Sequence, residues 1–313
     1  MTRRHRVALT GLSLIVAALM MWWWVQSFDV SGAAVTAVFR HVSWWPVLPL
    51  FALIAGHIAL SSWRWSLIEA ALGGTRPRFG PAFATGAFAQ GLGTFLPSPL
   101  VHVACRGLAN RMNGASGMRG AVSGGIDQIA DFAVILLIAV PAAFAFARRD
   151  AESYYLGAAL MLPVGLFFTL FLPPVVRSIR WPVFLLGKGE ALSRLDRPTL
   201  LKIYGISLIR LFSLTLMNIL IHAAIGVGTI SAIVVSVPLV ALTTSVAMLP
   251  GAIGVSEWSF SAVFAGFSIA PGAIVLFVLA NRILLTGVSL AIALIVLFAK
   301  MPAWLGRAPQ RRG

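Results

Sequence analysis

The stretch AVSGGIDQIADFAVILLIAVPAAFAFA, residues 121–147, decides the fold of this chain. It is apolar throughout apart from a short polar segment that holds Asp127 and Asp131, and a helix of ~20 such residues crosses a bilayer. Five further stretches meet the same test, namely 7–26, 44–63, 154–175, 203–226 and 272–298. The sequence therefore predicts an all-α, polytopic integral membrane protein with about six full transmembrane helices, the first of which is retained instead of being cleaved as a signal.

The composition supports the same class. Of 313 residues, 59% are hydrophobic and 11% are charged, whereas soluble domains carry about 25% charged residues. The net charge of +15 lies in short clusters between apolar runs, which is typical of membrane topology signals. We therefore expect membrane lipids as partners and no nucleic acid. A single cysteine, Cys105, and the lack of a Cys/His cluster lead us to expect no disulfide, metal or cofactor.

Two apolar stretches, 79–100 and 231–266, are broken by proline and glycine. The breaks are Pro97 and Pro99 in the first stretch and Pro250, Gly251 and Gly254 in the second. Irregular backbone at membrane depth is tolerated only where it is buried in protein or lines a wet cavity. Both stretches are therefore predicted to be re-entrant helical hairpins, and their matched Leu-Pro turns suggest an inverted repeat. The alternative is a pair of spans kinked by proline.

The basic residues give an orientation. With a cytoplasmic N-terminus and two re-entrant hairpins, nineteen Lys and Arg, Arg64 and Arg106 among them, lie in cytoplasmic segments. Three lie outside, and the positive-inside rule favours this split. We predict one transmembrane domain over 1–313 with both termini, a connector at 176–202 and a basic tail at 300–313 in the cytoplasm. Four tryptophans that flank the second span are expected to anchor it at the membrane interface: Trp44, Trp45, Trp63 and Trp65.

Three acidic residues, Asp127, Asp131 and Glu257, fall within predicted membrane segments. Each costs on the order of 3 kcal/mol at the bilayer centre unless it is paired or hydrated. The aspartates are four residues apart and share one helix face, and the expected partners are Arg106 and Arg111, or Arg282. The pair could receive a basic headgroup or an ion, or could be an ion pair that only locks helices together. Glu257 can accept from helix N-terminal amides.

Three other polar residues lie in or beside the spans. Arg210 is expected to snorkel to the cytoplasmic interface. His57 is expected to be a core histidine without an evident partner, and His102, just after Pro99, is a candidate site residue.

Four motifs occur in a particular order along the chain. They are Arg64-Trp65, the segment from Pro97 to Arg106, Asp127-Gln128-Ile129-Ala130-Asp131, and Leu249 to Glu257, which reads Leu-Pro-Gly-x-x-Gly-Val-x-Glu. This pattern resembles the lysylphosphatidylglycerol synthase transmembrane-region family, the flippase-like domain of aminoacyl-phosphatidylglycerol synthases. The chain departs from the family pattern in two places. It has Val101-His102-Val103 where a glycine and an acidic residue are usual, and Asp127-Gln128 where Glu-Arg is common.

The resemblance implies a stand-alone lipid flippase, without the synthase domain, in a bacterial cytoplasmic membrane. It would move a phospholipid, glycolipid or polyprenyl-type lipid whose headgroup the departures leave open. The predicted substrate-binding residues are Asp127, Asp131, Glu257, Arg106, Arg282 and His102. The alternatives are a membrane-embedded enzyme or an accessory scaffold of cell-envelope lipid or glycan synthesis. We expect no enzyme, since no catalytic constellation has motif spacing, and no ATP hydrolysis, since Gly187-Lys188-Gly189 lacks the Walker pattern.

Overall fold

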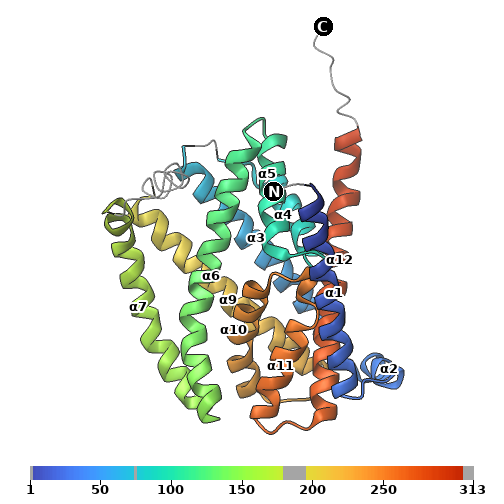
Figure 1. Ribbon diagram of the computed structural model, residues 1–313. Helices are drawn as coiled ribbons and strands as arrows, with labels where there is room; N and C mark the ends of the chain where they lie inside the picture. The colour runs from blue at the N-terminus through green and yellow to red at the C-terminus, as the bar shows by residue number, and fades with distance from the viewer. Residues whose placement is uncertain (1–2, 74–75, 179–194, 306–313) are drawn as a thin grey trace.

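The computed structural model describes residues 3–73, 76–178 and 195–305, and these ranges are helical without a strand (Figure 1). Most of the predicted connector, 176–202, and of the predicted tail, 300–313, falls outside them. The all-α prediction is confirmed. The elements are α1 (Arg3–Ser27), α2 (Gly32–His41), α3 (Val47–Ala71), α4 (Phe79–Leu92), α5 (Ser98–Met112), α6 (Gly117–Arg148), α7 (Ala151–Ser178), α9 (Arg197–Ile225), α10 (Ile230–Ala247), the short 3-10 helix η2 (Pro250–Ala252), α11 (Val255–Gly266) and α12 (Pro271–Leu305).

Within the described residues, six helices are long and apolar enough to cross a membrane: α3, α6, residues Ala151–Phe171 of α7, α9, α10 and α12. Five of them correspond to predicted spans. The sixth, α10, belongs to the second broken stretch. The predicted span at 7–26 is helical as α1, and its described part from Gly11 meets the test only together with α2, across a bend of 82°.

The two broken stretches each form a helical hairpin. The first stretch forms α4 and the turn, and the second arm of its hairpin, α5, runs on to Met112, beyond the predicted end at 100. The second consists of α10 and α11 joined through η2. Figure 1 shows them in opposite halves of the bundle with their turns pointing toward each other, and the Gly251 N–H donates to the Leu96 carbonyl at 3.2 Å. At 1.5 Å per residue, α4, α5 and α11 are about 18–22 Å long and too short to cross. Because α10 alone is long enough, re-entry of the second stretch stays a prediction.

The ends of the helices fall on two sides of the bundle. The start of α1, the end of α12 and the connection from α5 to α6 lie toward the upper side in Figure 1, opposite the connection from α11 to α12. This is the relative arrangement that the count of basic residues requires. Two residues of that count were misplaced, because Arg64 and Arg106 are buried inside the bundle and not in loops. Seventeen then remain against three, which still favours the same orientation.

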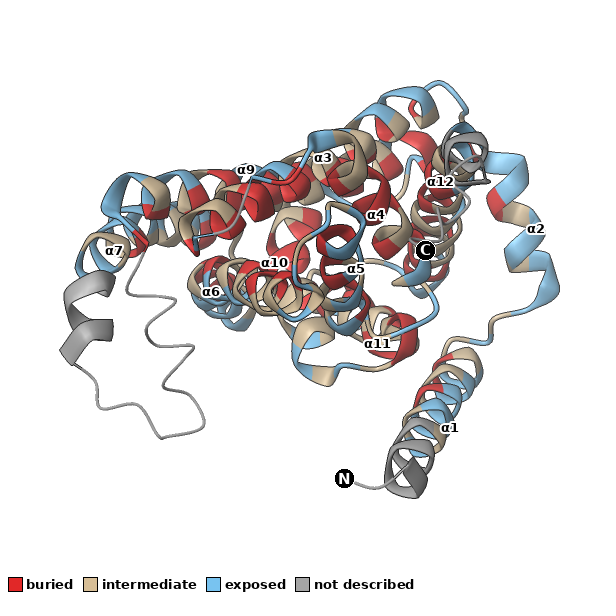
Figure 2. Cartoon of the chain, turned by 90° about the horizontal axis from the view of Figure 1, so that it is seen from above, coloured by how far each residue is buried: buried red, intermediate tan, exposed pale blue. Residues whose placement is uncertain are grey.

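The largest core cluster joins helices that are distant in sequence. Trp24 of α1, Ile54 of α3, Ile221 of α9, and Phe264 and Phe277 of α11 and α12 are all buried in it. Seen from above, buried residues concentrate between these helices, and α1 stands at the edge of the bundle (Figure 2). The core therefore holds α11 and α12 against α3 and α9.

The meeting of the two hairpin turns depends on a glycine. Gly251 has φ +57°, and a Cβ built on it would press against the Thr94 carbonyl oxygen. We predict that Gly251→Ala destabilises the protein more than Gly226→Ala, whose φ is +68° but which has nothing within 4 Å. Both variants bear the left-handed backbone cost of about 1–2 kcal/mol, and only the first adds the clash. Thermal unfolding of the purified protein in detergent measures the difference, and equal losses would contradict the hairpin contact.

Candidate functional site

Asp127 and Asp131 lie on one face of α6, as their spacing predicted, and they face arginines from three other helices. We call Arg64, Arg106, Asp127, Asp131 and Arg210 the arginine–aspartate cluster. Asp127 is fully buried, and 20% of the Asp131 side chain is exposed. At Gly124, one turn before Asp127, a Cβ would come within 2.9 Å of the Arg106 Cβ. A small residue here lets α5 pack closely on α6, which positions Arg106 beside Asp127.

Arg64 of α3 is the centre of this cluster. Its Nε donates to Asp127 Oδ1 at 2.6 Å and its Nη2 donates to the Asp127 carbonyl at 2.8 Å. Its Nη1 donates to Asp131 Oδ1 and, at 2.6 Å, to the Ser207 hydroxyl of α9. One fully buried guanidinium thereby joins α3, α6 and α9 and forms ion pairs with both aspartates. Of the expected partners, Arg106 is confirmed by a longer ion pair with Asp127, whereas Arg282 pairs with Glu257 and Arg111 has no ion pair with either aspartate among the described residues. Arg64, which was not expected, makes the close contacts.

Arg210 of α9 binds the other oxygen of Asp131. Its Nη1 donates to Asp131 Oδ2, and its Nη2 lies 3.0 Å from His57 Nε2. Because an arginine only donates, Nε2 accepts, and His57 Nδ1 donates to Ser213 Oγ at 2.8 Å. His57 is therefore neutral. The expectation that Arg210 snorkels was wrong, because Arg210 is 7% exposed. His57 is a satisfied histidine inside the bundle, as expected, although the sequence did not identify its partners.

Arg106 of α5 is the third cation of the cluster. Its guanidinium lies 4.8 Å from the Trp65 ring centroid and donates to the Ala82 carbonyl and the Ser61 hydroxyl. Its Nη2 is 4.0 Å from Asp127 Oδ2. Trp65 is itself fully buried and donates to Ser123, so its predicted role as an interface anchor was wrong. The other three tryptophans are exposed, and for them that role stays a prediction.

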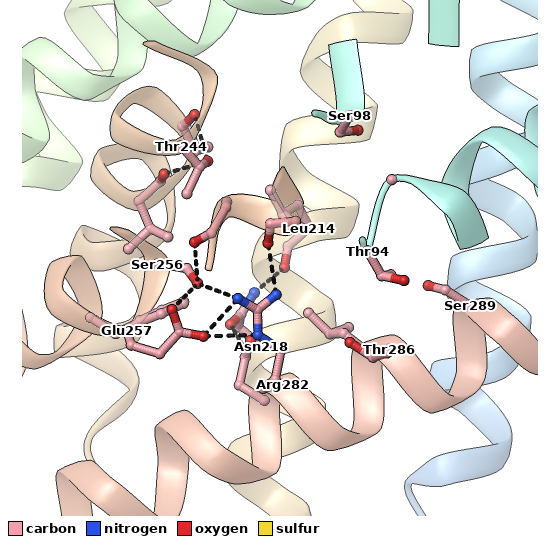
Figure 3. A pocket seen from close by; sticks show the side chains of 18 of the residues that line it. Thr94, Ser98, Leu214, Asn218, Thr244, Ser256, Glu257, Arg282, Thr286 and Ser289 are labelled. Carbon is pink, nitrogen blue, oxygen red and sulfur yellow. Dashed lines mark hydrogen bonds and ion pairs between the residues drawn. The ribbon is translucent and has the colours of Figure 1, made fainter. Parts of the chain in front are cut away.

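A second polar group lies at the turn of the second hairpin, and we call Ser256, Glu257 and Arg282 the tip cluster (Figure 3). Glu257 Oε2 accepts from the Gly254 N–H at 2.7 Å and from Ser256 Oγ at 2.8 Å. The Gly254 bond is of the kind that the sequence predicted. Glu257 Oε1 accepts from Arg282 Nε at 2.8 Å, and Arg282 Nη1 donates to the Gly251 carbonyl at 2.8 Å. Arg282 therefore pairs with Glu257 and not with the aspartates of α6.

Two adjoining cavities lie beside the tip cluster and the arginine–aspartate cluster. The smaller, of about 310 Å³, contains the tip cluster and a pair of asparagines, Asn281 and Asn218, joined by a hydrogen bond of 2.5 Å. The larger, of about 530 Å³, contains His57, Asp131 and Arg210. Both are lined by the hairpin turns and the same parts of α4, α5, α9 and α10: Gln90, Gly93, Ser98, Leu214, Ala241, Thr244, Gly251 and Ala252.

The larger cavity has a polar interior and an apolar rim. His102 of α5 lines it and is 7% exposed, and His102 Nδ1 lies 2.9 Å from the Ser98 carbonyl. On the outer side it is bordered by exposed apolar side chains of α6 and of the end of α10: Ile129, Phe132, Val246 and Met248. The cavity therefore connects buried charge with the apolar outer surface of the bundle.

The six predicted substrate-binding residues fall at different depths. Asp131 and His102 line the larger cavity, and Glu257 and Arg282 line the smaller one. Asp127 and Arg106 lie behind Asp131 and line neither. Of the predicted breaks, Gly251 lies at the meeting of the hairpins and Pro99 lines the larger cavity.

The sequence analysis missed a third buried acid, Glu69 of α3. Its Oε1 accepts from Asn110 Nδ2 and from Arg119 Nε at 2.8 and 2.6 Å, and its Oε2 accepts from the Ser123 hydroxyl at 2.6 Å. The second span was predicted to end at residue 63, so Glu69 counted as a loop residue. This network ties α3 to α5 and α6, and it touches neither cavity.

Removing Arg64 tests the cluster. We predict that Arg64→Met destabilises the protein by about 3–5 kcal/mol, because truncating one partner leaves buried carboxylates uncompensated. Arg40→Met, at an exposed position on α2, removes the same charge and is expected to change stability by less than about 0.5 kcal/mol. Thermal unfolding of both purified variants in detergent measures the loss of stability. Similar losses in the two variants would show that Arg64 does not hold the helices together.

The fold and the two clusters can now be set beside known proteins. No curated protein and no solved structure matches the chain. The model of one protein family, described as the lysylphosphatidylglycerol synthase TM region, matches residues 11–293, which include both hairpins and both clusters. The resemblance inferred from the four sequence motifs is thereby confirmed, and the chain belongs to the lysylphosphatidylglycerol synthase TM region family.

Proposed function

We propose that this multi-pass membrane protein translocates a lipid across the cytoplasmic membrane, with the headgroup passing through the two adjoining cavities. The observation that carries the proposal is the construction of the larger cavity. Its interior presents Arg210, Asp131 and His102, and its rim is made of exposed apolar side chains. An amphipathic molecule fits such a site with its polar end inside and its acyl chains outside, against α6 and α10.

The position of the cavities supports passage and not only binding. They lie where the turns of two hairpins meet from opposite halves of the bundle (Figure 1). Short or interrupted helices that meet near the middle of a membrane form the substrate sites of many transporters. A headgroup held at the shared lining would be separated from one side by the first hairpin and from the other side by the second.

The polar residues along this route match the chemistry of a headgroup. Hydroxyl and amide side chains occur on the walls common to both cavities, namely Gln90, Ser98 and Thr244. They can replace water around a phosphate or a sugar during passage. Each cavity is of a size usual for small-molecule sites, which suits a headgroup better than a complete lipid. The proposed movement is passive or coupled to an ion.

A bulky residue on the shared wall tests the route. Ala241 of α10 lines both cavities, so the indole of Ala241→Trp is expected to fill the junction. We predict at least about a tenfold slower movement of fluorescent lipids between leaflets, since blocking the route raises the barrier by more than about 1.4 kcal/mol. Protein reconstituted in liposomes with a panel of labelled phospholipids and glycolipids measures the rate by accessibility to a membrane-impermeant quencher.

The matched control is Ala143→Trp, which adds the same side chain at an exposed position on α6. It is expected to leave the rate unchanged. If the unmodified protein moves no lipid faster than empty liposomes do, or if both variants transport equally well, the proposed route is wrong.

A further inference from the structure

Every carboxylate oxygen that lines the cavities already accepts from an arginine or another donor. Both oxygens of Asp131 are bonded to arginines. Both oxygens of Glu257 are bonded within the tip cluster. A cationic headgroup would therefore meet only carboxylates whose negative charge an arginine already compensates.

The hydrogen-bond donors of the arginine–aspartate cluster, in contrast to these carboxylate oxygens, are not all paired. Among the described residues, the buried Nε atoms of Arg106 and Arg210 have no hydrogen-bond acceptor. Arg210 lines the larger cavity and is 7% exposed. The charge of its guanidinium thus lies at the wall of the space that a headgroup would occupy, although the unpaired Nε itself is buried. The remaining unpartnered oxygen, Asp127 Oδ2, belongs to a fully buried side chain that lines neither cavity.

The net charge of the two clusters also favours an anionic ligand. The two clusters together hold four arginines, Arg64, Arg106, Arg210 and Arg282, against three acids, Asp127, Asp131 and Glu257. Of these, Arg210, Arg282, Asp131 and Glu257 line the cavities, and the other three lie behind them. His57 accepts a hydrogen bond from Arg210 and adds no charge. The Glu69–Arg119 pair adds no net charge. A net positive charge in a desolvated interior is costly unless an anion compensates it.

We propose that the lipid bound in the larger cavity has an anionic headgroup of the phosphodiester type, with Arg210 as its donor. The inference rests on the proposed function for the route by which the headgroup arrives. A phosphate oxygen accepts from the Arg210 guanidinium at the cavity wall and compensates the excess positive charge, because arginine binds phosphate through several donors. Cationic headgroups are disfavoured, since each acid that lines the cavities is already paired with an arginine.

Binding to the detergent-purified full chain tests this without any transport. Native mass spectrometry compares three lipids of equal chain length at equal concentration: phosphatidylglycerol, which is anionic, phosphatidylcholine, which is zwitterionic, and O-ethylphosphatidylcholine, which is cationic. The anionic lipid is expected to bind at least about tenfold more tightly than the cationic one, a difference of about 1.4 kcal/mol. Equal binding of the three lipids, or tighter binding of the cation, overturns the proposal.

Two variants with opposite expected effects sharpen the test. Asp131→Asn keeps Arg210 and releases it from its carboxylate, so the preference for the anion rises severalfold. Arg210→Gln removes the donor, so most of the preference is lost. Lys202→Gln, which removes an exposed charge from the same helix, is the matched control and leaves the preference unchanged. A loss of anionic binding in Asp131→Asn, with thermal unfolding as in the unmodified chain, overturns the proposal.

The failure of this inference is distinguishable from failure of the proposed function. If liposomes move lipids of all three charges at the same rate, translocation stands and the anionic preference is wrong. If the anionic lipid binds selectively but no lipid moves, the preference stands and translocation is wrong.

Discussion

The bonds of the Arg64 guanidinium to Asp127, Asp131 and Ser207 set the relative positions of α3, α6 and α9. Inside a bilayer, lipid tails are as apolar as leucine, so the hydrophobic effect does not drive helices together. Polar groups that must find partners then decide which faces meet. Because Arg64 holds Asp131 from one side, the other oxygen of Asp131 is presented to Arg210 at the larger cavity. The lock between the helices thus also shapes the candidate site.

The hairpin turns satisfy a second constraint, which is that backbone polar groups at membrane depth need partners. The Gly251 N–H is bonded to the Leu96 carbonyl of the other hairpin, and the Gly251 carbonyl accepts from Arg282. At the next break in the helix, the Gly254 N–H donates to the Glu257 carboxylate. These partners come from the turn between α4 and α5, from α11 and from α12, so the irregular turn is held from several directions. The same packing leaves the two cavities between the turns.

Much of the fold follows from the sequence, because span length and proline placement are local properties. Five of the six predicted spans and the second hairpin lie at nearly their predicted positions, whereas the first hairpin runs to Met112, beyond the predicted end at 100. The partners of the buried charges could not be predicted, because pairing depends on which helix faces meet. Arg64 and Trp65 follow an apolar run and look like residues at an interface, although α3 continues to Ala71. Arg210 shows the same limit of sequence-based prediction. A cation near the end of a span can snorkel or form an ion pair, and the ion pair with Asp131 depends on how α9 packs against α6.

The arginine–aspartate cluster contains more positive charge than is needed to hold the helices together. A buried ion pair stabilises little compared with well-packed apolar residues of the same volume, and two arginines would balance the two aspartates. The third cation, Arg106, has one weak contact with Asp127 at 4.0 Å and rests mainly on Trp65 and neutral oxygens. Its presence makes the cluster positive on the side of the bundle where the cavities lie. A positive interior next to an apolar, exposed rim is the arrangement that an anionic amphiphile complements, and packing of the helices alone gives no reason for it.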